Sequence, residues 1–509
     1  MIFSYLEARL GEDWLIGYDS QEFFALAHQV SQRLKPSTAT PPTILLAERH
    51  PVKFLAYFMG ACSTPCTIAL ANPDWGTTEW HQVLELVQPD LIWGEGGKTA
   101  EGRKAGARSQ KPEARSQKLL KIQNSNLKIQ NSKFKIQNSF SSPLILIPTG
   151  GTSGKIRFAA HTWETLMASV QGFQHYFGVH QIHSFCVLPP YHVSGLMQFL
   201  RSFTSGGKLI LQPFKSIEGG DFGTVDPKDF FLSLVPTQLQ RLLSPEKNFP
   251  QSPSPVTWLS QFKTVLLGGA PAWPGLLEMA RQHQIRLAPT YGMTETASQI
   301  VTLKPEDFLR GINSCGQVLP HAQVTICDPE GNRLGSNQTG RITIQAKSLC
   351  LGYCLAGDGS DNANLKESLS NSINIQFQKG IFQPDDLGFF DSQGYLHIIG
   401  RSSDKIITGG ENVFPAEVEA AIRMTGLIRD VCVMGVSDRH WGEAVCALYI
   451  PINPTVSSIK IQAALIDKLS KFKCPKHWIV VESLPRNLQG KIDRRQAKRM
   501  IELKIRAEN

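Results

Sequence analysis

The chain has 509 residues, of which 41% are hydrophobic and 19% are charged, so it can bury a large core and form more than one domain. It contains no apolar run of about 18 residues or more, and its first residues lack the basic and apolar segments of a signal peptide. We therefore expect no integral membrane association and a cytoplasmic location, where the ten cysteines are reduced thiols.

The net charge of +9 lies in one segment. Residues 98–140 contain eleven Lys or Arg and two Glu, a net charge of +9, so the rest of the chain is neutral overall. The segment repeats Ala-Arg-Ser-Gln-Lys twice and Lys-Ile-Gln-Asn-Ser three times, and its apolar positions do not form a coiled-coil seam. We interpret it as a low-complexity, solvated insertion, with a binding arm as the alternative, and expect no nucleic-acid partner.

Apolar runs alternate with helix-like segments along the first 300 residues. Residues 43–47, 66–70 and 91–93 read as strands, and residues 52–62 and 78–88 read as amphipathic helices. Strands that alternate with helices predict a parallel, doubly wound sheet. Further strands are expected at 144–147, 185–188, 208–211, 264–267 and 286–288.

The pattern changes after residue 315. Residues 315–399 contain short strands and Gly, Asn and Asp turns, which indicates a small β-barrel or a meander, and residues 356–380 read as a long mobile loop. The last hundred or so residues form an α+β segment of the size of a small domain. The predicted fold is therefore α/β, with a large N-terminal domain (1–400) of doubly wound αβα sheets plus a small β-barrel subdomain, and a small C-terminal domain (401–509).

A loop of small residues follows the strand expected at 144–147. Residues 148–155 read Pro-Thr-Gly-Gly-Thr-Ser-Gly-Lys, and backbone N–H groups in such a loop can wrap an anion. The Walker pattern requires Gly at the position of Thr149 and Ser or Thr at the position of Ile156. We therefore expect a nucleotide phosphate loop that is not a Walker loop.

Two more polar islands follow strands. Gly268-Gly269-Ala270-Pro271 lets the backbone approach a flat ligand closely. Residues 291–296, Tyr-Gly-Met-Thr-Glu-Thr, combine an aromatic ring that can stack on a purine with a carboxylate that can hold Mg²⁺ against phosphate oxygens. Taken singly, Tyr291 fits a core position and Glu295 a surface charge equally well.

In this order, the islands resemble the adenylate-forming superfamily, which includes acyl-CoA synthetases, firefly luciferase and peptide-synthetase adenylation domains. The resemblance covers nearly the whole chain outside the insertion. Beyond residues 148–157 and the two islands, it is carried by Pro189-Pro190-Tyr191-His192, Asp386-Leu387-Gly388, Gly400-Arg401-Ser402-Ser403-Asp404-Lys405, Gly409-Gly410-Glu411-Asn412 and Gly490-Lys491.

The resemblance implies two half-reactions. A carboxylate attacks the α-phosphate of ATP, which gives an acyl-AMP and pyrophosphate, and a thiol, usually that of coenzyme A, then displaces AMP. Because an anion attacks a polyanion, the site has to supply positive charge and positioning. ATP, Mg²⁺ and coenzyme A are the implied cofactor and co-substrates.

The resemblance also assigns roles. Glu295 would bind Mg²⁺, Asp386 would accept hydrogen bonds from the ribose with Arg401 beside it, and Lys491 would bridge the carboxylate and the α-phosphate. A solvated lysine in the basic tail is the alternative for Lys491. The implied catalytic residues are Lys491, His192, Glu295 and Arg401, and the implied ATP site comprises Thr149, Gly150, Gly151, Thr152, Ser153, Gly154, Lys155, Gly269, Ala270, Pro271, Tyr291, Gly292, Met293, Thr294, Asp386 and Arg401.

Further roles concern the thiol step. His192 would gate the passage between the acyl pocket and the thiol tunnel, although a lone histidine after a strand fits a core position as well. Ser403 falls at the hinge, near residues 401–404, about which the small domain swings. Gly409 and Gly410 would line the tunnel. The chain departs from the usual pattern at Gly150, Ser153, residues 156–158 and residues 384–385.

Within the superfamily the chain is similar to the 2-succinylbenzoate–CoA ligases of menaquinone and phylloquinone synthesis. The similarity is carried by residues 192–196, 294–302 and 409–417, and it implies an acyl pocket that includes His192, Gly268, Ser298 and Gln299. Arg201 interrupts an apolar run, and a buried guanidinium needs an anion such as a second carboxylate. The alternative is that Arg201 reaches the surface.

Other functions stay open at this point. Another aryl- or acyl-CoA ligase, or a stand-alone adenylation enzyme that loads a carrier protein, would share every ATP motif. A non-enzymatic sensor would be expected to lack Lys491 or Glu295, and both are present. The expected partners are a small carboxylic acid, ATP and CoA, and the sequence leaves open whether copies of the chain form a homo-oligomer.

Overall fold

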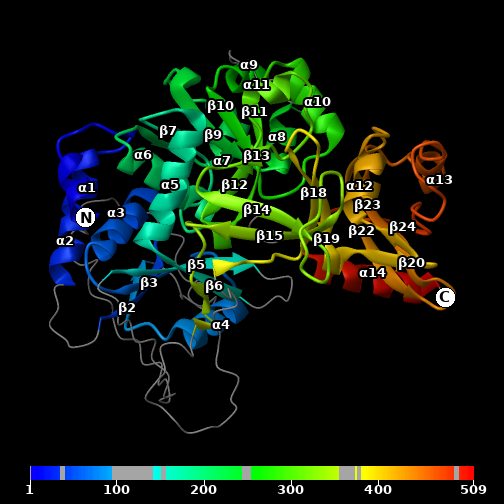
Figure 1. Cartoon of the computed structure of the whole chain (residues 1–509), viewed down its shortest axis with the longest axis horizontal. Coiled ribbons are helices and arrows are strands. Elements are labelled where there is room, and N and C mark those ends of the chain that lie inside the picture. Colours follow the sequence, from blue (N-terminus) through cyan, green and yellow to red (C-terminus); the bar gives the residue numbers. More distant parts are fainter. Residues whose placement is uncertain are drawn as a thin grey trace, which may run out of the picture. The chain divides into compact units, whose positions relative to one another are not determined.

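The computed structural model describes residues 2–34, 41–94, 142–150, 156–243, 254–354, 373–374, 380–486 and 492–508. The insertion at 98–140, most of the loop at 356–380, phosphate-loop residues 151–155 and Lys491 lie outside this part. The chain divides into two compact units, one with residues 1–211, 293–298 and 347–378, the other with residues 212–292, 299–346 and 379–509. Figure 1 labels the helices and strands of both units. The predicted domain boundary at residue 400 falls inside the second unit and stays a prediction.

The first unit contains a seven-stranded sheet in the order β17-β16-β6-β5-β3-β2-β4. Its central strands are parallel and fully buried, so they read as continuous apolar runs rather than alternating ones. Strands β6 and β16 add to it in antiparallel fashion. The strands are β2 (Thr43–Ala47), β3 (Thr67–Leu70), β4 (Leu91–Gly94), β5 (Leu144–Gly150), β6 (Ile156–Thr162), β16 (Gly352–Cys354) and β17 (Ile373–Asn374).

A second set of parallel strands in this unit runs in the order β1-β8-β7. Strand β7 ends at Cys186, two residues before the predicted end, because the chain turns ahead of Pro189 into helix α6. A cluster of aromatic rings, with Trp14 and Phe203 at 4.9 Å between centroids, packs here. The remaining elements are β1 (Leu15–Ile16), β7 (His183–Cys186), β8 (Leu209–Leu211), α1 (Ile2–Ala8), α2 (Ser20–Arg33), α3 (Pro51–Cys62), α4 (Thr77–Val87), α5 (Trp163–Phe177) and α6 (Val193–Thr204).

The second unit begins with strands in the order β9-β10-β11-β12-β13, of which the first three are parallel. Strand β11 is longer than predicted and runs into the polar island at 291–293. The elements are β9 (Phe230–Leu234), β10 (Thr264–Leu267), β11 (Leu287–Met293), β12 (Ser298–Thr302), β13 (Gln317–Val318), α7 (Phe214–Glu218), η2 (Pro227–Asp229), α8 (Pro236–Leu243), α9 (Pro255–Ser260), α10 (Pro274–Gln282) and α11 (Pro305–Leu309). The short helix η3 (Thr294–Thr296), between β11 and β12, belongs to the first unit.

A four-stranded antiparallel sheet follows in the order β14-β15-β18-β19. Strands β14 and β19 are the two ends of this order, so of the two predicted alternatives, a small β-barrel or a meander, the strands that the structure describes form the meander. The strands are β14 (Ala322–Cys327), β15 (Gly340–Ala346), β18 (Asp386–Phe390) and β19 (Leu396–Arg401).

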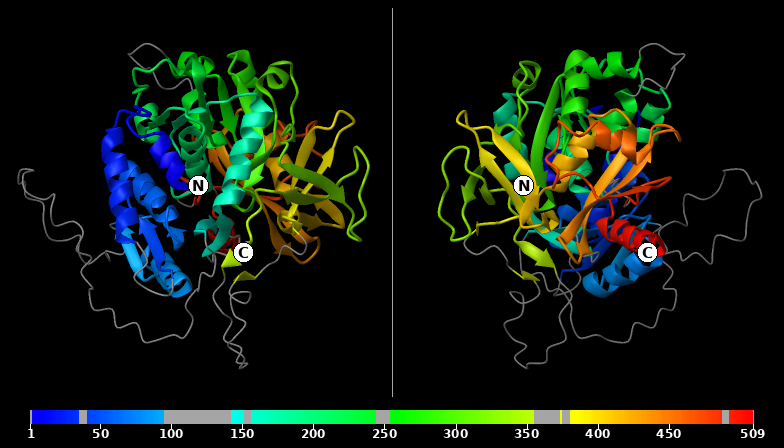
Figure 2. Two further views of the ribbon diagram at one scale, coloured as in Figure 1. Left: turned by 60° about the vertical axis from the view of Figure 1, so that its left-hand side comes forward. Right: turned by 90° about the vertical axis from the view of Figure 1, so that its right-hand side faces the viewer.

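The C-terminal segment is the predicted α+β fold. The right-hand panel of Figure 2 shows helix α14 in red against this five-stranded sheet, whose order is β21-β20-β23-β22 with β24 beside β23. No helix in the described ranges is long and apolar enough to cross a membrane. The elements are η5 (Ser402–Asp404), β20 (Ile406–Thr408), β21 (Glu411–Val413), α12 (Pro415–Arg423), β22 (Ile428–Asp438), β23 (Gly442–Pro451), α13 (Ser458–Ala463), β24 (His477–Val480) and α14 (Arg494–Glu508).

Candidate active site

The predicted phosphate loop connects two paired strands of the first unit. Strand β5 ends at Gly150, strand β6 begins at Ile156, and the two are antiparallel neighbours with Thr149 opposite Arg157. A Walker loop runs from a strand into a helix. Here the next element is a strand, which confirms that the loop is of a different kind. Residues 151–155, which carry most of the predicted anion contacts, lie outside the described residues.

The turn that carries Glu295 is held by its neighbours in the first unit. The Nε2–H of His161, on β6, donates a 2.8 Å hydrogen bond to the carbonyl of Thr294. The backbone N–H of Cys350 donates to the carbonyl of Glu295, also at 2.8 Å. These bonds fix the backbone of the short helix η3, so the direction in which the Glu295 side chain leaves it is set by the fold.

The Glu295 carboxylate is buried, and one of its oxygens accepts a hydrogen bond from a tyrosine. Its exposed fraction is 7%, and the Tyr353 hydroxyl donates a 2.5 Å hydrogen bond to Oε1. Among the described residues no three or more metal-ligating side chains gather anywhere. A lone carboxylate fits Mg²⁺, which proteins hold through one or two carboxylates together with the phosphates of a substrate. It does not fit a protein-only metal cage.

The two residues after η3 are in a left-handed conformation that non-glycine residues rarely adopt. Ala297 has φ 50° and Ser298 has φ 87°. Two hydrogen bonds hold this backbone: Ser169 Oγ donates to the Ala297 carbonyl at 2.7 Å, and Thr296 Oγ1 donates to the Ser298 carbonyl at 2.6 Å. Strain that is held in this way is common at functional sites, and here it directs the Ser298 hydroxyl.

Arg201 is a buried cation in the first unit. It is 2% exposed, and its guanidinium lies 4.4 Å from the centre of the Phe173 ring. Its Nη2 donates a 3.1 Å hydrogen bond to Ser298 Oγ. Burial lowers the pKa of Arg201 to about 9, so at neutral pH the side chain is still charged. The alternative in which Arg201 reaches the surface is therefore wrong.

His192 is the N-cap residue of α6, the helix that carries Arg201. Its ring packs edge-on against Tyr191, with 4.7 Å between centroids. The first turn of the helix lies against the preceding chain so closely that a Cβ on Gly195 would be 2.2 Å from the Pro189 carbonyl oxygen. His192 and Arg201 are thus on one rigid helix, about 13 Å apart along its axis at 1.5 Å per residue. The gating role of His192 stays a prediction.

The second unit brings together three of the predicted nucleotide residues. The Tyr291 hydroxyl donates a 2.7 Å hydrogen bond to Asp386 Oδ2, and Arg401 Nε lies 3.5 Å from Asp386 Oδ1. Burial, followed by the charge of Asp386, raises the pKa of Tyr291 well above its usual value. The phenol therefore stays a donor, and the carboxylate is held at both oxygens. This arrangement suits a fixed acceptor for hydroxyl groups, as predicted for the ribose.

The glycine-rich island at 268–271 follows β10 in the second unit. A Cβ on Gly268 would lie 2.5 Å from Thr290 Oγ1, so the island and β11 meet without room for a side chain. Gly269, Ala270 and Pro271 are exposed and therefore accessible to a ligand. Gln299, which was assigned to the acyl pocket, is 5% exposed on β12.

The backbone of the predicted hinge residue is hydrogen-bonded to an aspartate. The backbone N–H of Ser403 donates to Asp385 Oδ2 at 3.0 Å, and that of Ser402 donates to the Asp385 carbonyl at 2.8 Å. Asp385 is one of the positions at which the sequence departs from the superfamily pattern. This departure from the superfamily pattern therefore contacts the predicted hinge, whose role stays a prediction.

Gly409 and Gly410 form the two-residue turn between β20 and β21. Their φ angles are 59° and 86°, which the tight turns of two-residue hairpins require. A Cβ on Gly409 would also meet the Trp441 ring at 2.8 Å. The two glycines are therefore explained by the turn itself, and their role in a thiol tunnel stays a prediction.

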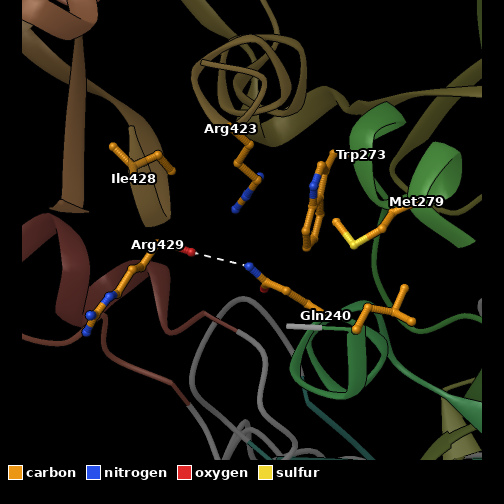
Figure 3. A pocket seen from close by; sticks show the side chains of 7 residues that line it. Gln240, Trp273, Met279, Arg423, Ile428 and Arg429 are labelled. Carbon is orange, nitrogen blue, oxygen red and sulfur yellow. Dashed lines mark hydrogen bonds between the residues drawn. The ribbon is translucent and has the colours of Figure 1, made fainter. Parts of the chain in front are cut away.

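A cavity of about 190 Å³ lies in the second unit (Figure 3). Gln240 Nε2 donates a 3.5 Å hydrogen bond across it to the Arg429 carbonyl, and the Arg423 guanidinium lies 5.1 Å from the Trp273 ring. It is smaller than the usual ligand pocket of about 300–1,000 Å³, and its lining includes none of the predicted site residues. The cavity is therefore not the candidate active site.

Neutral His161 makes the stability of the first unit depend on pH. Burial lowers its pKa to about 4, so as the pH falls from about 6.5 to about 4 the unfolded chain binds a proton that the folded chain excludes. The free energy of unfolding therefore decreases by about 1.4 kcal/mol for each pH unit by which the pH is lowered, about 3 kcal/mol in all. We expect His161→Gln, which keeps a donor for Thr294, to flatten this part of the pH dependence.

The measurement is the unfolding midpoint between pH 7 and pH 4.5. The exposed His283→Gln variant serves as the control, and it should retain the slope of the unaltered chain. Equal slopes for the unaltered chain and His161→Gln would contradict the assignment.

Four residues that contact predicted site residues or their neighbours in the structure were not among the predicted site residues. The sequence did contain a signal for Arg157 and Asp385, because both stand at positions where the superfamily usually has other residues. His161 and Tyr353 had none, since each reaches the turn at 294–295 from a distant part of the chain, Tyr353 across 58 positions.

The chain is similar to known proteins in sequence. Residues 18–354 match the AMP-binding enzyme family, and residues 417–491 match the AMP-binding enzyme C-terminal domain. The 2-succinylbenzoate–CoA ligase of Listeria monocytogenes is 32% identical over 358 residues, which cover 69% of this chain and 68% of that protein. The enzyme of the same name from Enterococcus faecalis is 32% identical over 354 residues, 68% of this chain and 67% of that protein.

Solved structures give the same fold. The o-succinylbenzoate CoA synthetase of Bacillus subtilis, in complex with its acyl-adenylate intermediate, has a TM-score of 0.74 at 24% identity and covers 97% of both chains. ATP-bound MatB of Rhodopseudomonas palustris also has a TM-score of 0.74, at 21% identity and 98% coverage of both chains. The predicted α/β class is thereby confirmed.

Proposed function

Because the chain belongs to the AMP-binding enzyme family, we propose that it is an ATP-dependent acid–thiol ligase that forms an acyl-AMP and then an acyl-CoA. The acid is 2-succinylbenzoate, and the product is the 2-succinylbenzoyl-CoA of menaquinone or phylloquinone biosynthesis. The names of the curated relatives support this choice. The observation in the structure that carries it is the buried guanidinium of Arg201, which is hydrogen-bonded to Ser298 Oγ and, as a cation, can bind a second carboxylate through charge-assisted hydrogen bonds.

The first step joins the acid to AMP. The carboxylate oxygen forms a bond to the α-phosphorus as the bond to the pyrophosphate oxygen breaks, so pyrophosphate leaves with the electron pair. Lys491 bridges the two anions, and residues 149–155 hold the β- and γ-phosphates. Glu295 would hold Mg²⁺, which neutralises charge on the phosphate oxygens. Asp386, fixed by Tyr291 and Arg401, accepts hydrogen bonds from the ribose hydroxyls.

The second step exchanges AMP for the thiol. The sulfur of CoA attacks the acyl carbonyl, AMP leaves with the phosphate oxygen, and the thiol proton passes to solvent or to the leaving phosphate. His192 stands at the entrance that the thiol uses, and the segment after Ser403 swings to bring Gly409 and Gly410 against the pantetheine arm.

The acid is recognised at two places. Arg201 and Ser298, which are hydrogen-bonded to each other, bind the carboxylate that does not react. A charge-assisted hydrogen bond to a buried guanidinium contributes about 1.5–3 kcal/mol, which is enough to favour a dicarboxylate over a monocarboxylate by one to two orders of magnitude.

One assay tests the proposal. The chain is incubated with ATP, Mg²⁺, CoA and a panel of acids, and pyrophosphate and thioester are measured separately. We expect both products with 2-succinylbenzoate and neither with benzoate or fatty acids. Pyrophosphate without thioester would instead indicate an adenylation enzyme that loads a carrier protein, and products from another aryl acid would indicate a different acyl-CoA ligase.

We also propose that the chain acts in the cytoplasm, where ATP and CoA are available, without nucleic-acid partners. All ten cysteines are free thiols in the structure, which suits a reducing compartment. Sedimentation at micromolar concentration tests whether the chain is a homo-oligomer.

Deleting residues 100–140 is expected to leave both half-reactions intact. The insertion lies between β4 and β5, which are three strand spacings apart in the sheet, about 14 Å. Because the chain also has to return along the sheet by one strand length of about 13 Å, the straight-line separation that it has to span is roughly 20 Å. The eight residues that remain between the strands reach about 27 Å. Unchanged kcat and KM for all substrates check this, and a folded but inactive deletion variant would contradict it.

A further inference from the structure

Three side chains of the first unit form a continuous row that ends at the Glu295 carboxylate. The Arg157 guanidinium lies 4.6 Å from the centre of the Tyr353 ring. The Tyr353 hydroxyl in turn donates its hydrogen bond to Glu295 Oε1 at 2.5 Å. Tyr353 and Glu295 are 4% and 7% exposed, so the row is largely shielded from water.

The sheet register explains why Arg157 and Tyr353 meet. Strands β6 and β16 are antiparallel neighbours, and Tyr353 lies opposite Ala159. Arg157 is two positions from Ala159, so its side chain leaves the same face as a diagonal neighbour of Tyr353. The opposite neighbour of Arg157 on β5 is Thr149, the first residue of the predicted phosphate loop. One strand pair therefore carries both the loop and the cation.

The chemistry of the row fixes the carboxylate. A phenol has one proton to donate and a carboxylate oxygen can only accept, so the Tyr353 hydroxyl is the donor of this bond. The bond is charge-assisted because its acceptor is a carboxylate. It occupies Oε1 and leaves Oε2 available to a metal ion. The cation over the ring face holds the ring in the donating position.

We propose that Tyr353 is a positioning residue that orients the Glu295 carboxylate for Mg²⁺, and that Arg157 holds Tyr353 in place. The inference rests on the proposed function, because it takes Glu295 as the residue that binds the metal. Carboxylates that ligate metals depend on such hydrogen-bonded neighbours, and removing one weakens metal binding by about 10- to 100-fold.

The test is Tyr353→Phe, which keeps the ring and removes only the donor. Binding of Mn²⁺ is measured by electron paramagnetic resonance in the presence of α,β-methylene-ATP and without any acid, so no turnover is needed. We expect Mn²⁺ binding to weaken about tenfold. In the pyrophosphate assay, the Mg²⁺ concentration for half-maximal rate should rise by the same factor, while the rate at saturating Mg²⁺ stays within about twofold of the unaltered rate.

The chain offers a matched control. Tyr395 also donates its hydroxyl to a carboxylate, Asp307 Oδ2, at 3.2 Å, in the second unit and outside the predicted site. Tyr395→Phe removes the same kind of bond and should leave Mn²⁺ binding unchanged. If Tyr353→Phe lowered only the unfolding midpoint, as the control does, Tyr353 would have a structural role alone and the inference would be overturned.

Arg157 provides an independent variant. Arg157→Met removes the charge but keeps an unbranched side chain over the ring, and we expect a smaller weakening of Mn²⁺ binding in the same direction. Arg157→Lys should restore most of it. Metal binding that is the same in all three forms would overturn the part assigned to Arg157.

Glu295→Gln separates this inference from the proposed function. If Glu295→Gln weakens Mn²⁺ binding and Tyr353→Phe does not, the metal role of Glu295 stands and the positioning role of Tyr353 fails. If neither variant changes Mn²⁺ binding, Glu295 is not the metal residue and that part of the proposed function fails as well.

Discussion

Glu295→Gln is expected to lower the rate of pyrophosphate formation about a thousandfold at millimolar Mg²⁺. Metal stabilisation of charge on phosphate oxygens is worth several kcal/mol, and each 1.4 kcal/mol is a factor of ten. Gln keeps the shape of the side chain, and its Oε1 can still accept the Tyr353 hydroxyl, so the fold should persist. The measurement is pyrophosphate release with 2-succinylbenzoate over a range of Mg²⁺ concentrations.

Asp307→Asn is the control for this variant. It alters another carboxylate that accepts a tyrosine hydroxyl, on helix α11 and outside the predicted site, and should leave the rate unchanged. A Glu295→Gln protein that adenylates at the unaltered rate would remove Glu295 from the mechanism. A loss that added Mg²⁺ fully reverses would instead show a weak contribution to metal affinity alone.

Arg201→Ala is expected to raise KM for 2-succinylbenzoate about a hundredfold and to leave KM for ATP unchanged. The reason is that the variant removes a buried cation that is hydrogen-bonded to Ser298 and positioned on Phe173, at a cost of about 1.5–3 kcal/mol for a bond to a charged partner. Initial rates with varied acid at saturating ATP and CoA provide the measurement.

Two further variants at this position separate charge from packing. Arg201→Met keeps the contact with the Phe173 ring and should raise KM as Arg201→Ala does, whereas Arg201→Lys should recover part of the affinity. An analogue that lacks the carboxylate that does not react should bind the unaltered chain and Arg201→Met equally well. An unchanged KM for 2-succinylbenzoate in Arg201→Ala would show that Arg201 does not contact the acid.

The sequence predicted the buried parallel strands well, because a strand covered on both faces is a continuous apolar run. Strands at 43–47, 264–267 and 208–211 are found within one residue of their predicted ends. The strand predicted at 185–188 ends earlier because the apolar run continues into the turn before Pro189. After residue 315 the sequence left a small β-barrel or a meander open, since short strands with turn residues suit both, and the described strands form an antiparallel meander.

The candidate site was predicted where its residues form local motifs. The superfamily resemblance is confirmed by the match to the AMP-binding enzyme family, and the burial of Arg201 settles one alternative that the sequence left open. Contacts between distant segments could not be predicted: Tyr353 with Glu295, His161 with Thr294, and Tyr291 with Asp386. The left-handed backbone at Ala297 and Ser298 was also hidden, because neither residue type signals it.

The hydrogen bonds that Asp385 accepts from the backbone of residues 402 and 403 affect how readily the predicted hinge turns. If the chain turns at Ser403 as predicted and this N–H leaves the exposed Asp385 carboxylate, the loss is about 0.5–1.5 kcal/mol. Before any thiol arrives, this bond alone would therefore favour the arrangement with the bond intact by about two- to tenfold. A relative with glycine at this position lacks that carboxylate and therefore that bias. In such a relative, a smaller fraction of the enzyme would be held in the first arrangement before the thiol step.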